Sequence, residues 1–309
     1  MRLNTKNILK LRDRKYAAKE PRKNHRLDVI YALFDRHDPL PTQTEMAFYT
    51  DTSICIGCKA CEVACKQWNM LKTTDIQWSG NSYDNTRELS DETWRHVKFV
   101  ERFPESNATD EPAPVSIEAL LAEPKQGEWL LMSDHCKHCQ ESPCHEACPT
   151  GAIIRNEFGG IYYQTDICMG CRMCVAACPF GVPKVSDRTG HSMKCSECYD
   201  RLRDGLKPAC ATACTTTSIK FGPREEMVEM ARARLETLHE QGFEQANLYG
   251  VDEFPQYKPL NSFYLLMDEP AVYGLPNEPK LPIENMVGDY AKAFCMLLIA
   301  AFAVVVCLV

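Results

Sequence analysis

The stretch "CMGCRMCVAACP", residues 168–179, places four cysteines in a C-x2-C-x2-C-x3-C spacing and follows the last of them with a proline. The same spacing occurs at residues 55–65, and two further groups of four differ from it in one gap. In chain order, the groups are Cys55, Cys58, Cys61 and Cys65; Cys136, Cys139, Cys144 and Cys148; Cys168, Cys171, Cys174 and Cys178; and Cys195, Cys198, Cys210 and Cys214. Because they hold 16 of the 18 cysteines among 309 residues, the chain contains an internal repeat of one thiol-rich unit.

Three thiols within seven residues favour a loop that wraps around one small inorganic group. Zinc often binds C-x2-C pairs, but a zinc site usually draws two cysteines from each of two separated loops. The run C-x2-C-x2-C-x3-C-P is instead the spacing of bacterial ferredoxins, in which the fourth cysteine ligates the other cluster of a pair. A disulfide framework fits poorly, because disulfide-dense chains are usually small secreted domains. The spacing therefore predicts iron–sulfur clusters, with zinc as the alternative.

Sixteen thiols, used four at a time, predict four [4Fe–4S] clusters. The second and third groups both end in Cys-Pro, so we expect them to exchange their fourth ligands as one two-cluster unit. These two ligand sets are Cys136, Cys139, Cys144 and Cys178, and Cys168, Cys171, Cys174 and Cys148. The first and fourth groups remain, and we expect them to pair across that unit. Their two ligand sets are Cys55, Cys58, Cys61 and Cys214, and Cys195, Cys198, Cys210 and Cys65.

The rest of the sequence excludes several classes of function. A formal net charge of -7 argues against nucleic acid as the main partner. No dinucleotide-binding G-x-G-x-x-G follows a predicted strand, and neither a P-loop nor a G-x-S-x-G nucleophile motif is present. For His135, His138 and His145, around the second group, we expect hydrogen bonding near the ligands or surface positions. The sequence predicts no catalytic residue, and the chain is expected to carry electrons between clusters.

The predicted fold class is α+β, with two interleaved ferredoxin-like two-cluster units and a C-terminal transmembrane helix. Residues 1–46 are expected to form a basic arm, 47–222 the four-cluster region, and 223–290 a helix and a proline-rich linker. In the four-cluster region, the first and fourth cysteine groups form one unit and the second and third form the other. The alternating run at 94–103 predicts a strand, and the amphipathic stretch 223–243 predicts a helix.

The segment "AKAFCMLLIAAFAVVVCLV", residues 291–309, contains Lys292 as its only charged residue. Nineteen helical residues span about 28 Å, which is close to the thickness of the hydrocarbon core of a bilayer. A buried helix of a soluble protein is the alternative, but a terminal helix rarely has protein on every side. We therefore expect a single-pass membrane anchor, in which Cys295 and Cys307 are packing residues.

The four groups with their flanking residues resemble the electron-transfer (beta) subunits of molybdopterin oxidoreductases, and most of all those of respiratory formate dehydrogenases. The stretches that carry this resemblance around the cysteines are "DTSICIGCKACEVACKQWN" (51–69), "CKHCQESPCHEACPTGAI" (136–153), "FGGIYYQTDICMGCRMCVAACPFGVP" (158–183), "KCSECYDRL" (194–202) and "PACATACTTTSIKFG" (208–222). Outside them, "LYGVDE" (248–253) and "FYLLMDEPAVYGLP" (263–276) are similar to formate dehydrogenase in particular.

The resemblance implies a heterotrimer. A catalytic subunit with a molybdenum or tungsten pterin cofactor oxidises formate, and this chain passes the electrons to a membrane cytochrome b subunit and on to quinone. The resemblance agrees with the ligand sets given above. It also implies that the cluster of the first cysteine group lies toward the catalytic subunit and that of the third group toward the haem. It favours a single-pass protein of the cell membrane with most of the chain on the extracytoplasmic side, and the cytoplasmic side remains the alternative.

Two other functions remain as alternatives. The chain could serve another molybdoenzyme in the same way, such as a polysulfide, sulfoxide or nitrate reductase. Nitrate reductase relatives usually have a tryptophan in the third group, which "CMGCRMCVAACP" lacks. The other alternative is a zinc-stabilised scaffold tethered to a membrane.

Overall fold

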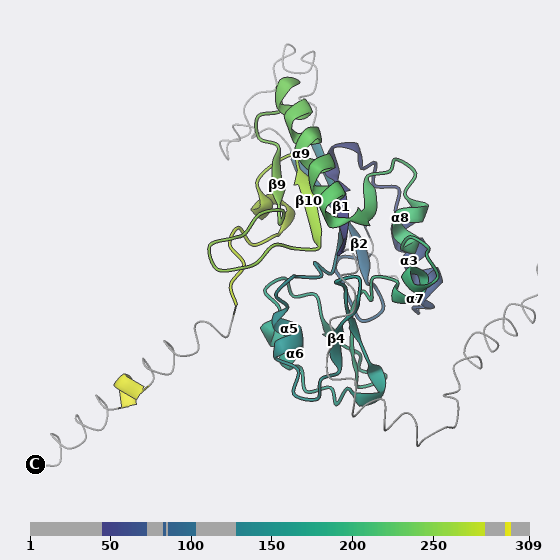
Figure 1. The fold of residues 1–309 in the computed structure, drawn as a ribbon, viewed down its shortest axis with the longest axis vertical. Helices are drawn as coiled ribbons and strands as arrows, with labels where there is room; N and C mark the ends of the chain where they lie inside the picture. Colours follow the sequence, from purple (N-terminus) through teal and green to yellow (C-terminus); the bar gives the residue numbers. More distant parts are fainter. Residues whose placement is uncertain (1–44, 73–82, 85, 103–127, 282–293, 298–309) are drawn as a thin grey trace, which may run out of the picture. The chain divides into compact units, whose positions relative to one another are not determined.

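The computed structural model describes residues 45–72, 83–84, 86–102, 128–281 and 294–297 (Figure 1). The predicted basic arm, except for its last two residues, lies outside these ranges, and so does most of the predicted anchor. The four residues of the anchor that the structure describes are helical. None of the helices in the described ranges combines the length and the apolar character that a membrane span requires.

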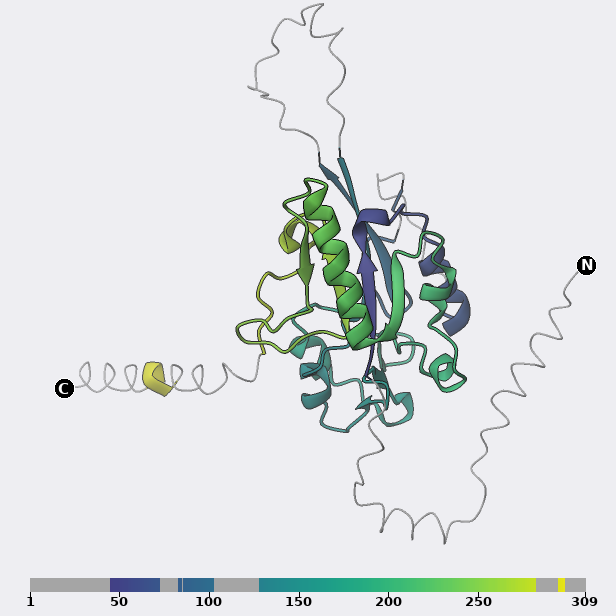
Figure 2. The same cartoon turned by 45° about the horizontal axis from the view of Figure 1, so that its top comes forward.

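A four-stranded sheet with the strand order β8-β1-β10-β9 forms the centre of the fold (Figure 2). Its strands are β1 (Met46–Asp51), β8 (Ile219–Pro223), β9 (Asn247–Tyr249) and β10 (Ser262–Leu266). Strand β1 pairs antiparallel with β8 and parallel with β10, and β9 pairs antiparallel with β10. The sheet therefore joins the beginning and the end of the cysteine-rich region to the segment that follows it.

Helix α9 (Arg224–Glu240) covers one face of the sheet (Figures 1 and 2). Its Met227, Ala231 and Leu238 are buried in one hydrophobic cluster with Tyr49 of β1 and Phe263 of β10. Fully burying a large apolar side chain contributes roughly 1.5–3 kcal/mol, so this face stabilises the sheet substantially. The helix lies within the predicted stretch, and its buried residues have the spacing of one helical face.

A hairpin covers the opposite face of the sheet. It consists of β2 (Arg95–Arg102) and β3 (Glu128–His135), which pair antiparallel along their full lengths. Val97 of β2 shares a hydrophobic cluster with Phe48 and Phe221, and Met132 of β3 shares another with Tyr264. Both faces of the central sheet are thus covered, which explains why every residue of β10 is buried.

The cysteine groups lie on short helices and loops beside this core. These helices are α3 (Ala60–Asn69), α5 (Pro143–Glu146), α6 (Met173–Ala177), α7 (Tyr199–Arg203) and α8 (Ala209–Ala213). Two small hairpins join them, β4 (Ile153–Arg155) with β5 (Ile161–Tyr163) and β6 (Lys184–Val185) with β7 (Ser192–Met193). Single 3-10 turns lie at η1 (Thr52–Ile54), η2 (Thr165–Ile167) and η3 (Pro270–Tyr273). Helix α3 packs against α8, and α5 against α6, so groups distant in sequence meet in space (Figure 1).

Two local sequence predictions match the structure closely. The alternating run at 94–103 forms β2, and the amphipathic stretch 223–243 contains α9. The segment after residue 223 also supplies strand β10, which pairs with β1 at the centre of the sheet. Only the paired structure shows this, since a parallel partner more than 200 residues away leaves no local pattern.

Candidate metal centres

The structure brings together cysteines from the second and third groups around a cavity. The cavity is lined by a set that we call quartet C: Cys136, Cys139, Cys144 and Cys178. Cys136 directly follows β3, Cys144 lies in α5 and Cys178 ends α6, so one thiol comes from the neighbouring group. Burial raises the pKa of Cys144 to about 12, although Lys194 opposes that rise.

A second cavity brings together the other members of the same two groups. It is lined by quartet D: Cys148, Cys168, Cys171 and Cys174. Ser192 supports two of these sulfurs, because its hydroxyl lies 3.2 Å from the sulfur of Cys174 and its amide donates to Cys168 at 3.5 Å. Burial would raise the pKa of Cys148, but hydrogen bonds with Thr150 and with backbone amides hold it below its usual value.

The first and fourth groups also meet. Quartet A is the set of Cys55, Cys58, Cys61 and Cys214. Burial raises the pKa of Cys55, and the nearby thiols of Cys214 and Cys58 raise it further. Cys61 shares a hydrophobic cluster with Cys214, and its sulfur lies 3.2 Å from the hydroxyl of Ser133.

Quartet B consists of Cys65, Cys195, Cys198 and Cys210, and all four are buried. Burial raises the pKa of Cys65, and the neighbouring thiols of Cys210 and Cys198 add to the rise. The pKa of Cys195 is also raised, first by burial and then by the thiol of Cys65. Each quartet therefore takes its four thiols from two cysteine groups.

The quartets follow one another in the order A, B, C, D. Besides burial, the Cys210 thiol of quartet B raises the pKa of Cys61 in quartet A, to about 11. The Cys136 thiol of quartet C likewise raises the pKa of Cys195 in quartet B. The Cys174 thiol of quartet D in turn raises the pKa of Cys144 in quartet C. Each pair of neighbouring quartets also shares a hydrophobic cluster, which contains Cys61 and Cys210, Cys136 and Cys195, or Cys144 and Cys174. The four quartets therefore form one continuous path.

The backbone turns in the same way in all four groups. The residue directly before the second cysteine has a positive φ, and this residue is Gly57, His138, Gly170 or Glu197. A Cβ atom at Gly170 would lie 2.1 Å from the carbonyl oxygen of Gly190, so no other residue fits there without a shift of backbone. The repeat seen in the sequence is thus a repeated loop conformation.

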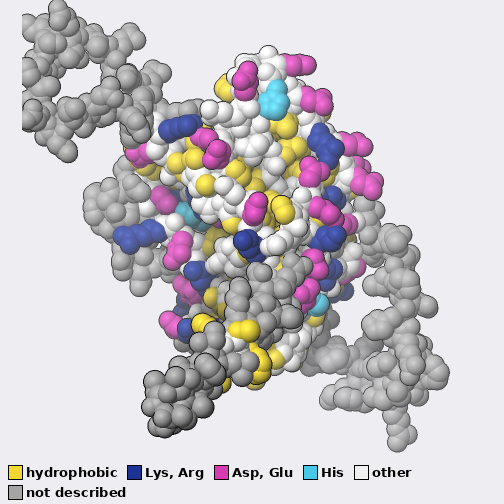
Figure 3. Space-filling view, turned by 90° about the vertical axis from the view of Figure 1, so that its left-hand side faces the viewer, with side chains coloured by type: hydrophobic (Ala, Val, Ile, Leu, Met, Phe, Trp, Pro, Cys, Tyr) yellow, Lys and Arg dark blue, Asp and Glu magenta, His cyan; other side chains and the backbone are white. Residues whose placement is uncertain are grey.

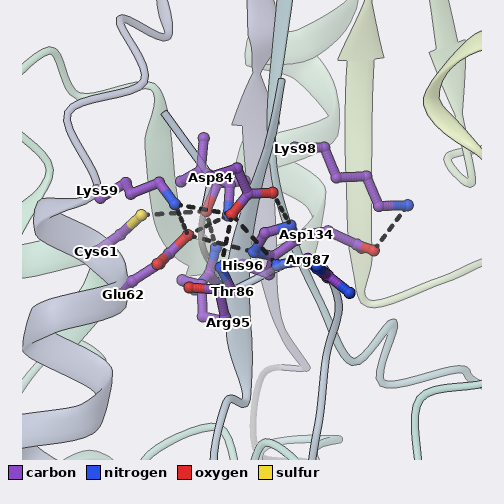
Figure 4. A network of polar contacts seen from close by, with 12 residues as sticks. Lys59, Cys61, Glu62, Asp84, Thr86, Arg87, Arg95, His96, Lys98 and Asp134 are labelled. Carbon is purple, nitrogen blue, oxygen red and sulfur yellow. Dashed lines mark hydrogen bonds and ion pairs between the residues drawn. The ribbon is translucent and has the colours of Figure 1, made fainter. Parts of the chain in front are cut away.

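A buried polar network supports quartet A (Figure 4). Glu62 of α3 accepts a hydrogen bond from the amide of Val97, and His96 lies 3.1 Å from the carboxylate of Asp84. Lys59 pairs with Asp84 at 3.0 Å. Burial would raise the pKa of Asp84, but His96 and Lys59 hold it below its usual value. No sequence pattern indicated this network, because its members come from three separate segments.

The histidines around the second group have structural positions. His135 and His138 are fully buried, and burial lowers the pKa of each well below its usual value. His135 contacts the hydroxyls of Ser262 and Tyr264, and His138 accepts a hydrogen bond from the amide of Ile161. His145 is exposed. These contacts agree with the expectation of hydrogen bonding or surface positions.

The quartets fit a group that brings positive charge. Burial and mutual repulsion raise the pKa of Cys65 and Cys139, so four thiolates enclosed together are unfavourable unless a bound group supplies positive charge. Iron in a cluster replaces the protons and removes that penalty. Within the described residues, no three His, Cys, Asp or Glu side chains converge as a single-ion site requires. The thiols of quartets C and D instead surround cavities.

On the face of the molecule in Figure 3, the described residues form no continuous area of one charge. Figure 3 shows acidic and basic side chains interspersed over one face of the molecule. Large apolar side chains are exposed beside the two end quartets: Ile56 and Val63 near quartet A, and Met169 and Met173 near quartet D. The exposed thiols Cys58 and Cys171 lie in the same loops.

Comparison with known proteins gives the family. Two models described as "4Fe-4S dicluster domain" match residues 54–152 and 127–224. The chain is 35% identical over 243 residues to the iron–sulfur subunit of the nitrate-inducible formate dehydrogenase of Escherichia coli (strain K12), covering 77% of this chain and 75% of that protein. It is 36% identical over 249 residues to the iron–sulfur subunit of formate dehydrogenase-O from the same organism, covering 77% and 73%. The B subunit of the anaerobic dimethyl sulfoxide reductase of that organism is 33% identical over 190 residues, covering 60% of this chain and 76% of that protein.

These matches cover all four cysteine groups, and the quartets are built from the same groups in pairs. The chain therefore contains two 4Fe-4S dicluster domains and belongs to the family of formate dehydrogenase iron–sulfur subunits.

Proposed function

We propose that this chain transfers electrons from a formate-oxidising molybdopterin subunit to a membrane cytochrome b subunit and quinone, through four [4Fe–4S] clusters. The observation that carries the proposal is the continuous path of four thiol quartets. Clusters held by neighbouring quartets exchange single electrons by tunnelling, and their potentials depend on charge, hydrogen bonds to sulfur and exposure. The family to which the chain belongs supports formate as the electron source.

The ligands in this proposal are the members of quartets A to D. The chain contributes more than thiols, because Ser133 and Ser192 place hydroxyls at 3.2 Å from the sulfurs of Cys61 and Cys174. Hydrogen bonds to sulfur stabilise the more negative, reduced form of a cluster. The surrounding hydrophobic residues exclude water from the middle of the path.

The two ends of the path are the proposed contact points with the partners. At quartet A, Ile56 and Val63 are 62% and 60% exposed, and at quartet D, Met169 is 67% exposed. Apolar side chains of this kind mark surfaces that a partner covers. By resemblance to the family, the catalytic subunit docks at quartet A and the cytochrome at quartet D.

The first test is to extract and purify the complex without oxygen and to add formate. We expect about sixteen iron atoms per copy of this subunit, four per cluster, and a brown visible absorbance that formate bleaches. Bleaching by dithionite but not by formate would support the role in electron transfer and reject formate as the source of the electrons. A colourless, zinc-containing preparation would overturn the iron–sulfur proposal.

A second candidate is the same role in a sulfoxide reductase. It is favoured by the 33% identity to the B subunit of dimethyl sulfoxide reductase. That match covers 60% of this chain, whereas the formate dehydrogenase matches cover 77%. Oxidation of the dithionite-reduced complex by dimethyl sulfoxide, together with no response to formate, would support this candidate.

We further propose that residues 291–309 anchor the subunit in the membrane, with most of the chain on the extracytoplasmic side. The support for the anchor is the apolar composition of the segment, whose only charge is Lys292, and the side of the membrane is taken from the resemblance to the family. Truncation after Glu284 should release the chain, alone or with its catalytic partner, into the soluble fraction. The full-length chain is the control. Full retention of the truncated chain on membranes would show that other subunits suffice to hold it there.

A further inference from the structure

Three cationic side chains are enclosed among the quartets: Arg95, Lys137 and Lys194, each no more than 3% exposed. Lys137 is neutralised, because its ammonium group contacts the carboxylate of Asp134. Arg95 has no such partner: no carboxylate of the described residues lies within ion-pair distance of its guanidinium. Its Nη2 has no hydrogen-bond partner among the described residues either.

The environment of Arg95 connects it to two quartets. Its Nη1 donates to the hydroxyl of Ser133 at 3.0 Å, and that hydroxyl lies 3.2 Å from the sulfur of Cys61 in quartet A. Because the serine oxygen accepts from Arg95, its own proton can be donated to the sulfur. The guanidinium also lies 5.3 Å from the centre of the Phe48 ring. Phe48 belongs to the hydrophobic cluster that contains Cys61 of quartet A and Cys210 of quartet B.

An unpaired buried cation is expensive, and breaking its compensation destabilises a fold strongly. An arginine cannot avoid that cost by losing its proton. A cubane with four thiolate ligands is net negative, and reduction adds one more negative charge. The clusters would therefore supply the negative charge that the described side chains around Arg95 do not.

Building on the proposed electron-transfer function, we propose that Arg95 is a fixed positive charge that raises the reduction potentials of the clusters in quartets A and B. The charge stabilises the reduced form of each cluster more than the oxidised form, because the attraction grows with the added electron. It acts on quartet A partly through the hydroxyl of Ser133, which it orients toward Cys61. Arg95 is a positioning and potential-setting residue, and it is not a cluster ligand.

Quartet D offers a matched control. Its cavity is lined by the cation Arg172, whose side chain is 69% exposed and lies 4.0 Å from the carboxylate of Asp187, whereas Arg95 is 2% exposed. Water and salt screen an exposed charge far more than a buried one. Removing the charge of Arg172 should therefore change cluster potentials much less than removing that of Arg95.

The experiment is a potentiometric titration of the anaerobically purified complex, followed by electron paramagnetic resonance. It compares the wild type with Arg95→Gln, Arg95→Lys and Arg172→Gln, after iron and sulfide have been counted in each. In Arg95→Gln, we expect the oxidised-to-reduced ratio of at least one cluster to rise about tenfold at a fixed potential, a fall of about 59 mV for a one-electron couple. Arg95→Lys should recover most of this change, and Arg172→Gln should change the ratio less than about twofold.

Unchanged midpoint potentials in an Arg95→Gln complex with full iron content would overturn the proposal. So would an equal shift in Arg95→Lys, because size rather than charge would then be responsible. If Arg95→Gln fails to keep its iron, retention by Arg95→Lys supports the charge, and loss in both variants overturns it. A wild-type complex without cubane signals would overturn the proposed function itself, and the role of Arg95 with it.

Discussion

The two end quartets and the two middle quartets are chemically alike but differ in how much of them solvent reaches. Cys58 of quartet A and Cys171 of quartet D are exposed, whereas all four thiols of quartet B are buried. In quartet C, Cys136 and Cys144 are buried and the other two are partly so. Electrons must enter and leave where a partner can approach, and they must be insulated in between. The fold therefore uses one repeated loop for two purposes, and the loops at the two ends differ from those in the middle in the exposure of their thiols.

The largest expected effects come from replacing one ligand at the middle and one at the end of the path. Cys195→Ser in quartet B and Cys171→Ser in quartet D should each lose about four iron atoms per subunit, one cluster. Cys195→Ser should also lower the yield of folded subunit, because Cys195 is buried in the core and its cluster holds two distant groups together.

Cys171→Ser should leave an assembled complex in which formate still reduces the remaining clusters while quinone reduction falls to background. Iron counts, folded yield and the two activities measure these outcomes. Unchanged quinone reduction in Cys171→Ser would contradict the order of the quartets.

The loop conformation can be tested within one quartet. Gly170→Ala places a methyl group against the carbonyl oxygen of Gly190, at a φ of +69°. Gly151→Ala has a similar φ, +65°, but meets no atom within 4 Å. The strain of the left-handed conformation costs roughly 1–2 kcal/mol in both variants, and the clash adds to it only in Gly170→Ala. We expect faster loss of quartet D iron on heating in Gly170→Ala than in Gly151→Ala, and equal rates would show that the clash is relieved.

The apolar rim of quartet D should matter for assembly more than for folding. Met169 is 67% exposed beside that quartet, and Met230 on α9 is 44% exposed away from it. Met169→Glu should weaken binding of the membrane partner about tenfold, because a charge in a desolvated contact costs more than about 1 kcal/mol. Met230→Glu should change it less than about twofold. Affinity is measured by co-purification with the membrane subunit over a series of concentrations of the detergent-extracted complex. Equal effects of the two variants would show that Met169 does not contribute to the contact.

The smallest expected effect separates a buried hydrogen bond from an exposed one. Ser192 contacts the sulfur of Cys174 at 3.2 Å in a buried position, and Thr150 contacts that of Cys148 at 3.6 Å in an exposed one. Ser192→Ala should lower the potential of the quartet D cluster so that the oxidised-to-reduced ratio rises a few-fold, because hydrogen bonds to sulfur favour the reduced form. Thr150→Ala should change the ratio less, since water replaces its hydroxyl. A larger shift in Thr150→Ala would reverse this ranking.

The sequence alone predicted the chemistry of the cysteine groups and much of the local structure. The spacing of the cysteines predicted the clusters, and the exchange of the fourth cysteine between groups predicted which thiols line the cavities of quartets C and D. The alternating run before Phe103 and the apolar stripe of α9 predicted β2 and the helix. These features could be predicted because ligand spacing and side-chain periodicity are local properties of the chain.

What lies between the quartets could be learned only from the folded chain. The parallel pairing of β1 with β10 joins residues more than 200 positions apart, and it places the hairpin that carries Arg95 against quartets A and B. That arginine is buried with no carboxylate of the described residues within ion-pair distance, and this depends on every element around it, so no local pattern indicates it. The short-range spacing of residues in a sequence indicates which atoms bind metal. The electrostatic environment of those atoms is the sum of contacts that form only when the chain is folded.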